Sequence, residues 1–549
     1  GETEAGHRGL MTLTALARNP PCRCGVRHCL APPKHRCRGA AEARRYRRAR
    51  VLARDGEDRE QSGNKPALPR GPGFVETLAD DVLDGIDRIR NAAGDAFEPT
   101  LRLGVTGLSG AGKSVFITAL VASLLSRERL RRMPAAAEGR ITGAVLRPQP
   151  DPNVPRFPYE THRALLQGRP PEWPVSTRAV SQVRIALRVR PTGFADALFG
   201  MLSEPLLGPR TLNLDVTDYP GEWLLDLPLI EQDYEQWAAE ALAATTNAAR
   251  APHAADWQQM LSGIEAGAAH DEAVAARLAA GYRDYLVRCR KAGLSALAPG
   301  RFLMPGDYEG SPALSFAPLP RPESGAGRRS STLWGQMRAR FEAYQRLIAK
   351  PFFRNHFARL DRQVVLVDAL QALELGPEAL ADMTSAMAET LACFRHGRSS
   401  WLDRLMGGRK IDRVLFAASK ADLLHHAQHP RLTALVEAML AEAAQRASFG
   451  GASVRGMAVA AIRATSEQDV DRGGQTLALV RGHDATGREM ALFPGTLPED
   501  PGELLRGGWR PDAGASFARV SFRPPEWGSG GPPHIRLDAA LDWLIGDRL

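Results

Sequence analysis

Apolar and polar residues alternate in several short stretches of this chain, and such alternation predicts β-strands. The stretches cover residues 100–106, 176–190 and 211–217. Gln and Arg side chains occupy much of the polar side of the second stretch. We therefore expect residues 176–190 to form a half-solvated strand at the edge of a sheet.

Other apolar runs are continuous, as is typical of strands buried inside a parallel sheet. They cover residues 363–368, 413–418 and 457–462. Helices are predicted where apolar residues recur every three or four positions. These helices span residues 74–89, 115–125, 377–394, 432–440 and 537–545. Strands that alternate with helices in this way predict an α/β fold.

Residues 222–355 have a different pattern, because helical spacing recurs there without a strand signal. The predicted helices span residues 229–249, 271–291 and 331–349. Their apolar stripes predict a helical insertion that packs on itself. The proline-containing residues 301–320 are expected to form an ordered loop or a linker.

Proline and glycine predict the remaining connections. Residues 133–173 are rich in proline, and we expect them to be mostly irregular. Residues 475–525 contain glycine-rich hairpin signals, the clearest of them at 484–487.

Charge is distributed unevenly over the 549 residues, whose formal net charge is +9. Residues 1–70 contain 16 Lys and Arg against 7 Asp and Glu, and the remaining chain contains 55 of each sign. We interpret residues 1–70 as a basic, disordered extension and expect no bulk preference of the globular part for nucleic acid. A basic arm that touches nucleic acid or acidic lipid is the alternative.

Targeting and cysteine signals are weak. No apolar stretch reaches the roughly 18 residues of a membrane span, and no signal peptide is evident, so a soluble cytoplasmic protein is expected. Four of the six cysteines lie in the extension beside two histidines: Cys22, Cys24, Cys29 and Cys37, with His28 and His35. They lack paired C-x-x-C spacing, so a zinc site is the weaker alternative and a disulfide framework is not expected.

A phosphate-binding pattern, G-x-x-x-x-G-K-[ST], spans Gly107–Ser114 between a predicted strand and a predicted helix. Glycines at positions 107, 110 and 112 allow unusual backbone conformations that turn N–H groups onto phosphate oxygens. Lys113 is expected to reach the β- and γ-phosphates and Ser114 to bind Mg²⁺. The expected cradle comprises Ser109, Gly110, Ala111, Gly112, Lys113, Ser114 and Val115. A glycine-rich turn in another α/β fold is the alternative.

A second motif, D-x-x-G, follows the strand at 211–217. Asp218 is expected to bind Mg²⁺ and Gly221 to offer an N–H to the γ-phosphate. Glu222 stands where many GTPases place a water-orienting glutamine, so it either orients water or caps a turn. Asp215 is a lesser metal candidate on the same strand, with a solvated edge position as the alternative. Thr177 precedes the predicted strand that lies between the phosphate loop and Asp218. A switch threonine normally meets Mg²⁺ and the γ-phosphate at this place in the chain.

A third motif, Ser419-Lys420-Ala421-Asp422, resembles the guanine-reading [NT]-K-x-D. The Asp422 carboxylate can accept from the N1–H and the N2 amino group of guanine, which adenine lacks, and the Lys420 stem can lie along the base. The alternative is that Asp422 caps a helix. Ala464, after the last core strand, is a candidate donor of a backbone N–H to guanine O6.

Six segments together resemble the YcjX-like family of bacterial stress-associated P-loop NTPases. They are L-S-G-A-G-K-S at 108–114, W-P-V-S-T-R at 173–178, D-V-T-D-Y-P-G-E-W at 215–223, R-F-L-M-P-G-D at 301–307, S-K-A-D at 419–422 and A-A-I-R-A-T at 460–465. The resemblance covers residues 71–549 and implies a three-layer, Ras-like P-loop domain that binds GTP or GDP with Mg²⁺ near envelope-stress functions. The unmatched tail is an upstream reading-frame extension if Met11 or a later residue is the start.

These observations predict four regions: the extension at 1–70, a first part of the nucleotide domain at 71–225, a helical insertion at 226–355 and a second part at 356–549. We expect a slow Mg²⁺-dependent GTPase that acts as a switch on the insertion. The expected partners are guanine nucleotide and a protein effector bound by the insertion, with a membrane-associated stress protein as one candidate and nucleic acid not expected. An ATPase and a nucleotide-stabilised scaffold without activity are the alternatives.

Overall fold

The computed structural model describes residues 98–107, 110–175, 179–190, 210–325, 328–394, 411–446, 452–472, 475–507 and 520–549. The chain divides into two units, 1–82 and 83–549, and every described residue belongs to the second. The expected basic extension and the expected helix at 74–89 lie outside the described residues.

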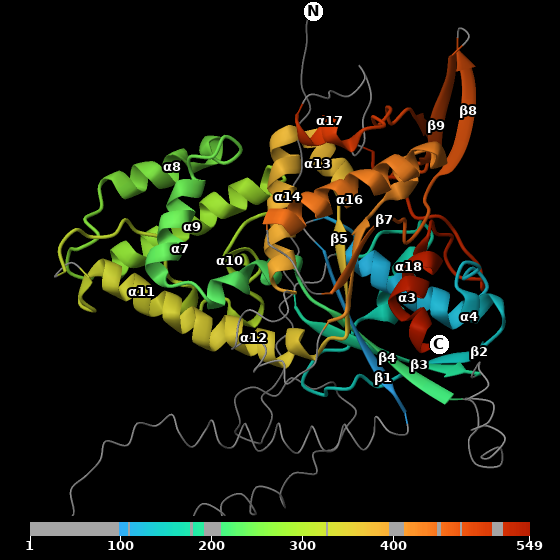
Figure 1. Cartoon of the computed structure of the whole chain (residues 1–549), viewed down its shortest axis with the longest axis horizontal. Coiled ribbons are helices and arrows are strands. Elements are labelled where there is room, and N and C mark those ends of the chain that lie inside the picture. The colour runs from blue at the N-terminus through green and yellow to red at the C-terminus, as the bar shows by residue number, and fades with distance from the viewer. Residues whose placement is uncertain are drawn as a thin grey trace, which may run out of the picture. The chain divides into compact units, whose positions relative to one another are not determined.

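A seven-stranded sheet forms the centre of the described unit, with the strand order β2-β3-β4-β1-β5-β6-β7 (Figure 1). The strands are β1 (Thr100–Gly107), β2 (Ile141–Arg147), β3 (Ser181–Val189), β4 (Arg210–Asp218), β5 (Arg362–Val367), β6 (Arg413–Ala418) and β7 (Ser453–Ala458). Neighbours from β4 to β7 pair in parallel, and β2 and β3 pair antiparallel to their neighbours. The predicted α/β class is confirmed.

Alternate residues of the buried strands enter two different cores, which makes the fold three-layered. In β5, Val364 and Leu366 pack with one core, and Val365 and Val367 pack with the other. The first core includes helices α3 (Lys113–Ser126), α5 (Tyr159–Leu166) and α18 (Leu537–Ile545). The second includes α13 (Ala369–Leu375), α14 (Pro377–Ala392) and α16 (His429–Arg446). Figure 1 shows α14 and α16 lying side by side.

The expectation that residues 176–190 form an edge strand is wrong. β3 lies between β2 and β4, and β2 is the edge. Arg184 on the polar side of β3 forms a cross-strand ion pair with Asp215, Nε to Oδ1 at 2.5 Å, whereas Arg188 on the same side is exposed. Residues 133–173 are likewise more regular than expected, since they contain β2, α5 and the short α4 (Pro134–Ala137).

The last core strand is also displaced from its expected position. β7 begins at Ser453 and ends at Ala458, whereas apolar continuity predicted 457–462. Residues beyond Ala458 are buried for another reason, because Ala460 bridges to Ile535 beneath the C-terminal segment. Burial by a neighbouring loop therefore produced the same apolar pattern as burial in a sheet.

The region 226–355, predicted to be a helical insertion, contains helices that lie as a group in Figure 1, and its boundaries as a domain stay a prediction. Its members are α7 (Tyr234–Ala244), α8 (Ala251–Ser262), α9 (Glu272–Lys291), α10 (Gly300–Leu303), α11 (Leu333–Tyr344) and α12 (Lys350–Asn355). Aromatic residues fill its interior, and Trp237 stacks on Phe341 with ring centroids 4.9 Å apart. Side chains of Asp271 and Thr332 cap α9 and α11 by accepting backbone N–H bonds.

A small antiparallel sheet, in the order β10-β9-β8, lies after β7. Its strands are β8 (Ser466–Arg472), β9 (Gln475–His483) and β10 (Glu489–Leu492), and α17 (Pro501–Leu505) follows. The predicted hairpin joins β9 to β10, where Asp484 accepts from the backbone N–H groups of Thr486 and Arg488. Within the described part of the chain, every helix is too short or too polar to cross a bilayer.

Candidate functional site

A cavity of about 360 Å³ opens at the carboxyl ends of the parallel strands, where α/β sheets commonly bind ligands. Its walls come from three predicted motifs and from the insertion. From the phosphate loop they include Gly107, Gly110, Ala111, Gly112, Lys113, Ser114 and Val115. From elsewhere they include Pro220, Glu222, Arg290, Met304, Ser419, Lys420, Asp422 and Ala464. The sequence motifs are thus brought together around one space.

The phosphate loop has the backbone that its glycines predict at two of three positions. Gly110 and Gly112 have φ of +78° and +79°, in the left-handed region that favours glycine. The interpretation of Gly107 needs correction, because its φ is not positive. This glycine ends β1, where a Cβ would lie 3.1 Å from Leu366 Cβ, so close packing against β5 explains it. Ser109 lies outside the described residues.

Lys113 and Ser114 begin α3 at the floor of the cavity. The Lys113 ammonium forms an ion pair with the Asp218 carboxylate, and both side chains are buried. Ser114 Oγ is buried and has no hydrogen-bond partner within the described ranges. A hydroxyl left without a partner next to the lysine that pairs with Asp218 offers, with that carboxylate, oxygen ligands of the kind that Mg²⁺ prefers.

Asp218 ends β4, and its neighbours are firmly held. Thr106 Oγ1 donates to the Tyr219 carbonyl at 3.0 Å, and the Tyr219 hydroxyl donates to Gln363 Oε1 at 2.7 Å. Gly221 begins the 3₁₀ helix η1 (Gly221–Asp226) between two residues that line the cavity. Asp215, the lesser metal candidate, is buried against Arg184 rather than solvated.

Glu222 lies in the cavity wall opposite an arginine from the insertion. Arg290 Nη2, in the last turn of α9, lies 2.9 Å from Glu222 Oε1. Arg290 could not be singled out from the sequence, because it is one of several basic residues in that turn and meets Glu222 only through the tertiary fold. The predicted switch residue Thr177 lies outside the described residues.

The segment Ser419–Asp422 follows β6. Lys420 has φ of +60° and forms an ion pair with Asp368, which follows β5. The Ser419 N–H donates to the Val367 carbonyl at 2.9 Å, so this segment is tethered to β5. Sequence reasoning missed Asp368, whose position directly after a buried strand was the available signal.

Asp422 and Ala464 lie together, as their predicted roles require. Asp422 Oδ2 accepts from the Ala464 N–H at 2.9 Å, and burial raises the pKa of this carboxyl to about 6. The helix-cap alternative is wrong, because Asp422 lies inside the short 3₁₀ helix η8 (Ala421–Leu423), which has no side-chain cap, and α16 begins only at His429.

Three further residues of the site were not predicted. Trp173 and Phe522 line the cavity, and Trp173 Nε1 donates to the Phe522 carbonyl at 2.7 Å. His162 on α5 is buried, and burial lowers its pKa, while the Asp218 carboxylate acts in the opposite direction. His162 and Phe522 come from segments outside the quoted motifs, whereas Trp173 begins the W-P-V-S-T-R segment.

Known proteins resemble this chain over most of its length. The model of the YcjX-like family, DUF463, matches residues 101–549. A protein of Escherichia coli (strain K12) named Ras-like GTPase YcjX is 39% identical over 460 residues, which cover 82% of this chain and 96% of that protein. A protein of the same name from Shewanella oneidensis is 36% identical over 476 residues, covering 82% and 94%. The chain therefore belongs to the YcjX-like family.

Proposed function

We propose that this chain binds GTP with Mg²⁺ and hydrolyses it, and that the bound nucleotide controls the helical insertion. One observation carries the proposal: a single cavity is lined by the phosphate loop, by the Ser419–Asp422 segment and by Arg290 and Met304 of the insertion. The relatives named Ras-like GTPase YcjX support guanine nucleotide as the ligand.

The phosphate end of the nucleotide would lie on α3. Backbone N–H groups of Gly110 to Val115, with the N-terminal end of the helix dipole, would bind the phosphate oxygens. Lys113 would exchange its ion pair with Asp218 for the β- and γ-phosphates. Ser114 and Asp218 would hold Mg²⁺, which supplies positive charge to the phosphates. A role of Thr177 in this shell stays a prediction.

The base would lie beside Asp422. An ionised carboxylate accepts two hydrogen bonds from guanine, whereas adenine offers an acceptor at N1 and no amino group at C2. The aliphatic stem of Lys420 would cover one face of the base while its ammonium remains with Asp368. Ala464 would exchange its N–H bond to Asp422 for one to guanine O6.

For hydrolysis, Glu222 would orient the attacking water and Arg290 would neutralise charge that develops on the transferred phosphoryl group. The two side chains are 2.9 Å apart in the cavity wall, so each fixes the orientation of the other. An arginine that lies over the phosphates stabilises the transition state of phosphoryl transfer in GTPases.

The turn after Asp218 would pass the nucleotide state to the insertion. Asp226 Oδ1 accepts from the Gly300 N–H at 2.6 Å, and Trp223 Nε1 donates to the Met304 carbonyl at 2.8 Å. Arg301 lies over the Trp223 ring, 3.2 Å from its centroid. Any movement of η1 therefore acts directly on α10. An effector bound to the insertion would read this movement.

Part of the proposal rests on the family resemblance alone. It includes an envelope-stress role, a membrane-associated stress protein as a candidate effector, and a place in the bacterial cytoplasm beside the inner membrane.

The test is competition of labelled GTP with ATP, followed by single-turnover hydrolysis with Mg²⁺. We expect GTP to bind in preference to ATP, Lys113→Ala to abolish hydrolysis, and Arg290→Ala to slow it by about a hundredfold. Arg288→Ala is the control, because Arg288 is on the same turn but pairs with Asp256. Preference for ATP would overturn guanine selectivity, and binding without phosphate release would identify a scaffold.

A further inference from the structure

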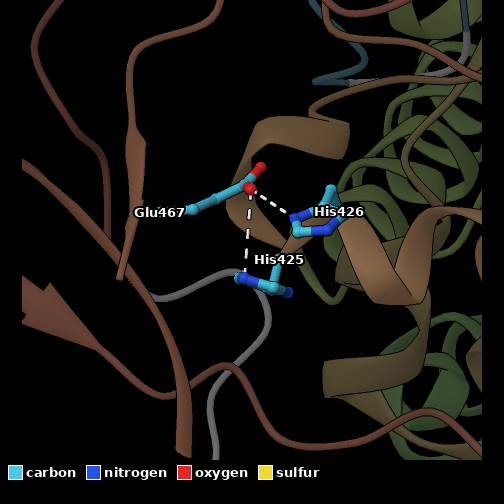
Figure 2. Close-up of side chains that lie close together, drawn as sticks. All are labelled: His425, His426 and Glu467. Atoms are coloured by element: carbon cyan, nitrogen blue, oxygen red, sulfur yellow. Dashed lines mark hydrogen bonds and ion pairs between the residues drawn. The ribbon is translucent and has the colours of Figure 1, made fainter. Parts of the chain in front are cut away.

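A cluster of two histidines and a glutamate lies outside the nucleotide cavity. We infer that His425, His426 and Glu467 form a binding site for a transition-metal ion of the zinc class. Figure 2 shows both rings directed at one carboxylate. His426 Nδ1 lies 2.5 Å and His425 Nε2 lies 3.9 Å from Glu467 Oε2, and the three ligand atoms lie within 4.8 Å of one another.

The fold positions this cluster from two segments. His425 and His426 begin the 3₁₀ helix η9 (His426–Gln428), and Glu467 is on β8. His425 is buried, which fixes its ring, whereas His426 is 67% exposed, which gives an ion in solvent access to the cluster. The two rings have their centroids 4.3 Å apart.

The donor set selects the class of ion. Two imidazole nitrogens with a carboxylate oxygen are ligands that Zn²⁺ accepts readily, whereas Mg²⁺ and Ca²⁺ prefer oxygen ligands alone. Asp469 Oδ1 lies 3.5 Å from His425 Nε2 and adds a negative charge beside these three ligands. The site therefore differs in chemistry from the proposed Mg²⁺ site.

The charges around the cluster also favour a cation. Glu467 and Asp469 contribute two negative charges, and Arg463 Nη2, 3.0 Å from Glu467 Oε1, contributes one positive charge. Arg463 pairs with Glu467 Oε1, so Glu467 Oε2, the oxygen nearer the histidines, remains available to bind the ion. When a metal ion binds His425 Nε2, the ring proton must be on Nδ1. Nδ1 can then no longer accept the weak 3.4 Å hydrogen bond from the Ala427 N–H, so that bond is lost.

Metal binding is tested on the full chain after removal of metal with a chelator. ZnCl₂ is titrated against a chromogenic zinc indicator with Mg²⁺ present, and bound zinc is compared between wild type and variants. We expect His426→Ala to bind one equivalent less than wild type and Glu467→Gln to bind zinc at least about tenfold more weakly. Cysteines in residues 1–70 are common to all variants, so they do not affect the difference.

His270→Ala is the matched control, because His270 also pairs with a glutamate, with Nε2 3.1 Å from Glu272 Oε2. It is expected to bind as much zinc as wild type. His426 is exposed, so its variant should fold even if His425→Ala does not. Equal zinc content in wild type and His426→Ala would overturn the site, as would crystals with zinc whose anomalous density lies away from these side chains. Neither outcome depends on nucleotide binding.

Discussion

Asp422 is a buried carboxyl group whose protonation state decides what it can bind. Folding raises its pKa from 3.8 to about 6, mainly because burial disfavours the charged form. The protonated form therefore stabilises the fold below pH 3.8, and this contribution is lost as the pH rises through about 6. Guanine binding would instead require the ionised form of Asp422, because the carboxylate is the acceptor of its hydrogen bonds.

The affinity for GTP should consequently fall as the pH is lowered through about 6. We expect the dissociation constant of labelled GTP, measured from pH 5 to pH 8, to rise at the acidic end. Asp422→Asn should bind guanine weakly, lack this part of the pH dependence, and favour xanthine nucleotide, whose C2 carbonyl accepts from the amide. Titration of the phosphates affects both proteins alike, so identical pH profiles would contradict the assigned role.

Single residues also show what the sequence could and could not predict about the site. The phosphate loop and Asp218 were predictable because their chemistry depends on local spacing. Arg290 was not, because it meets its partner, Glu222, only through the tertiary fold. Asp368 could have been found from its position directly after a buried strand, although its pairing with Lys420 depends on the tertiary fold. Gly107 was predicted as a special residue for the wrong reason, since its need is close packing rather than positive φ.

At the scale of elements, the contact between η1 and α10 is the closest link between the nucleotide domain and the insertion. A Cβ built on Gly300 would lie 1.8 Å from the Glu222 carbonyl oxygen. The added Cβ would collide with backbone atoms of Glu222, and no flexible side chain lies at this contact that could move aside. Any side chain at position 300 must therefore separate the two elements.

Gly300→Ala should lower the free energy of unfolding by about 1–3 kcal/mol, the usual effect of overpacking. It should also slow GTP hydrolysis, because the shift displaces Glu222. Gly263→Ala is the control, since a Cβ there meets nothing within 4 Å. Urea denaturation followed by circular dichroism measures both variants, and equal stability of Gly300→Ala and wild type would exclude a tight contact.

Elements differ in how well the sequence predicts them. β6 and α18 have their predicted bounds because each has a clear apolar pattern and a distinct end. β8 was not predicted, because Ser466–Arg472 is almost wholly polar and owes its conformation to pairing with β9. β2 was missed for a similar reason, as its seven residues are mostly half-exposed at the sheet edge. Hydrogen bonding to a neighbouring strand stabilises such strands without apolar side chains, so their sequences show no hydrophobic pattern.

At the scale of the whole molecule, one hydrophobic core extends from the sheet into the insertion. Val365 and Val367 of β5 belong to the same cluster as Trp237, Trp257 and other aromatic residues of the insertion. The insertion therefore has no separate core of its own.

The described unit should thus unfold in one transition. Bound nucleotide should raise the midpoint of that whole transition. GDP with Mg²⁺ at 100 times its dissociation constant should stabilise the protein by about 2.7 kcal/mol. Tryptophan fluorescence, dominated in the insertion by Trp237, Trp257 and Trp334, should report the same midpoint as circular dichroism. Two midpoints, only one of which responds to nucleotide, would contradict a shared core.

Helix α9 has a length that matters for regulation. Its 20 residues span about 30 Å from Glu272 to Lys291. One end carries Arg290 into the cavity wall, and the other begins at Asp271 among surface residues of the insertion. A rigid helix of this length would allow a protein bound at its N-terminal end to shift the position of Arg290. Control of turnover would then require no contact with the nucleotide itself.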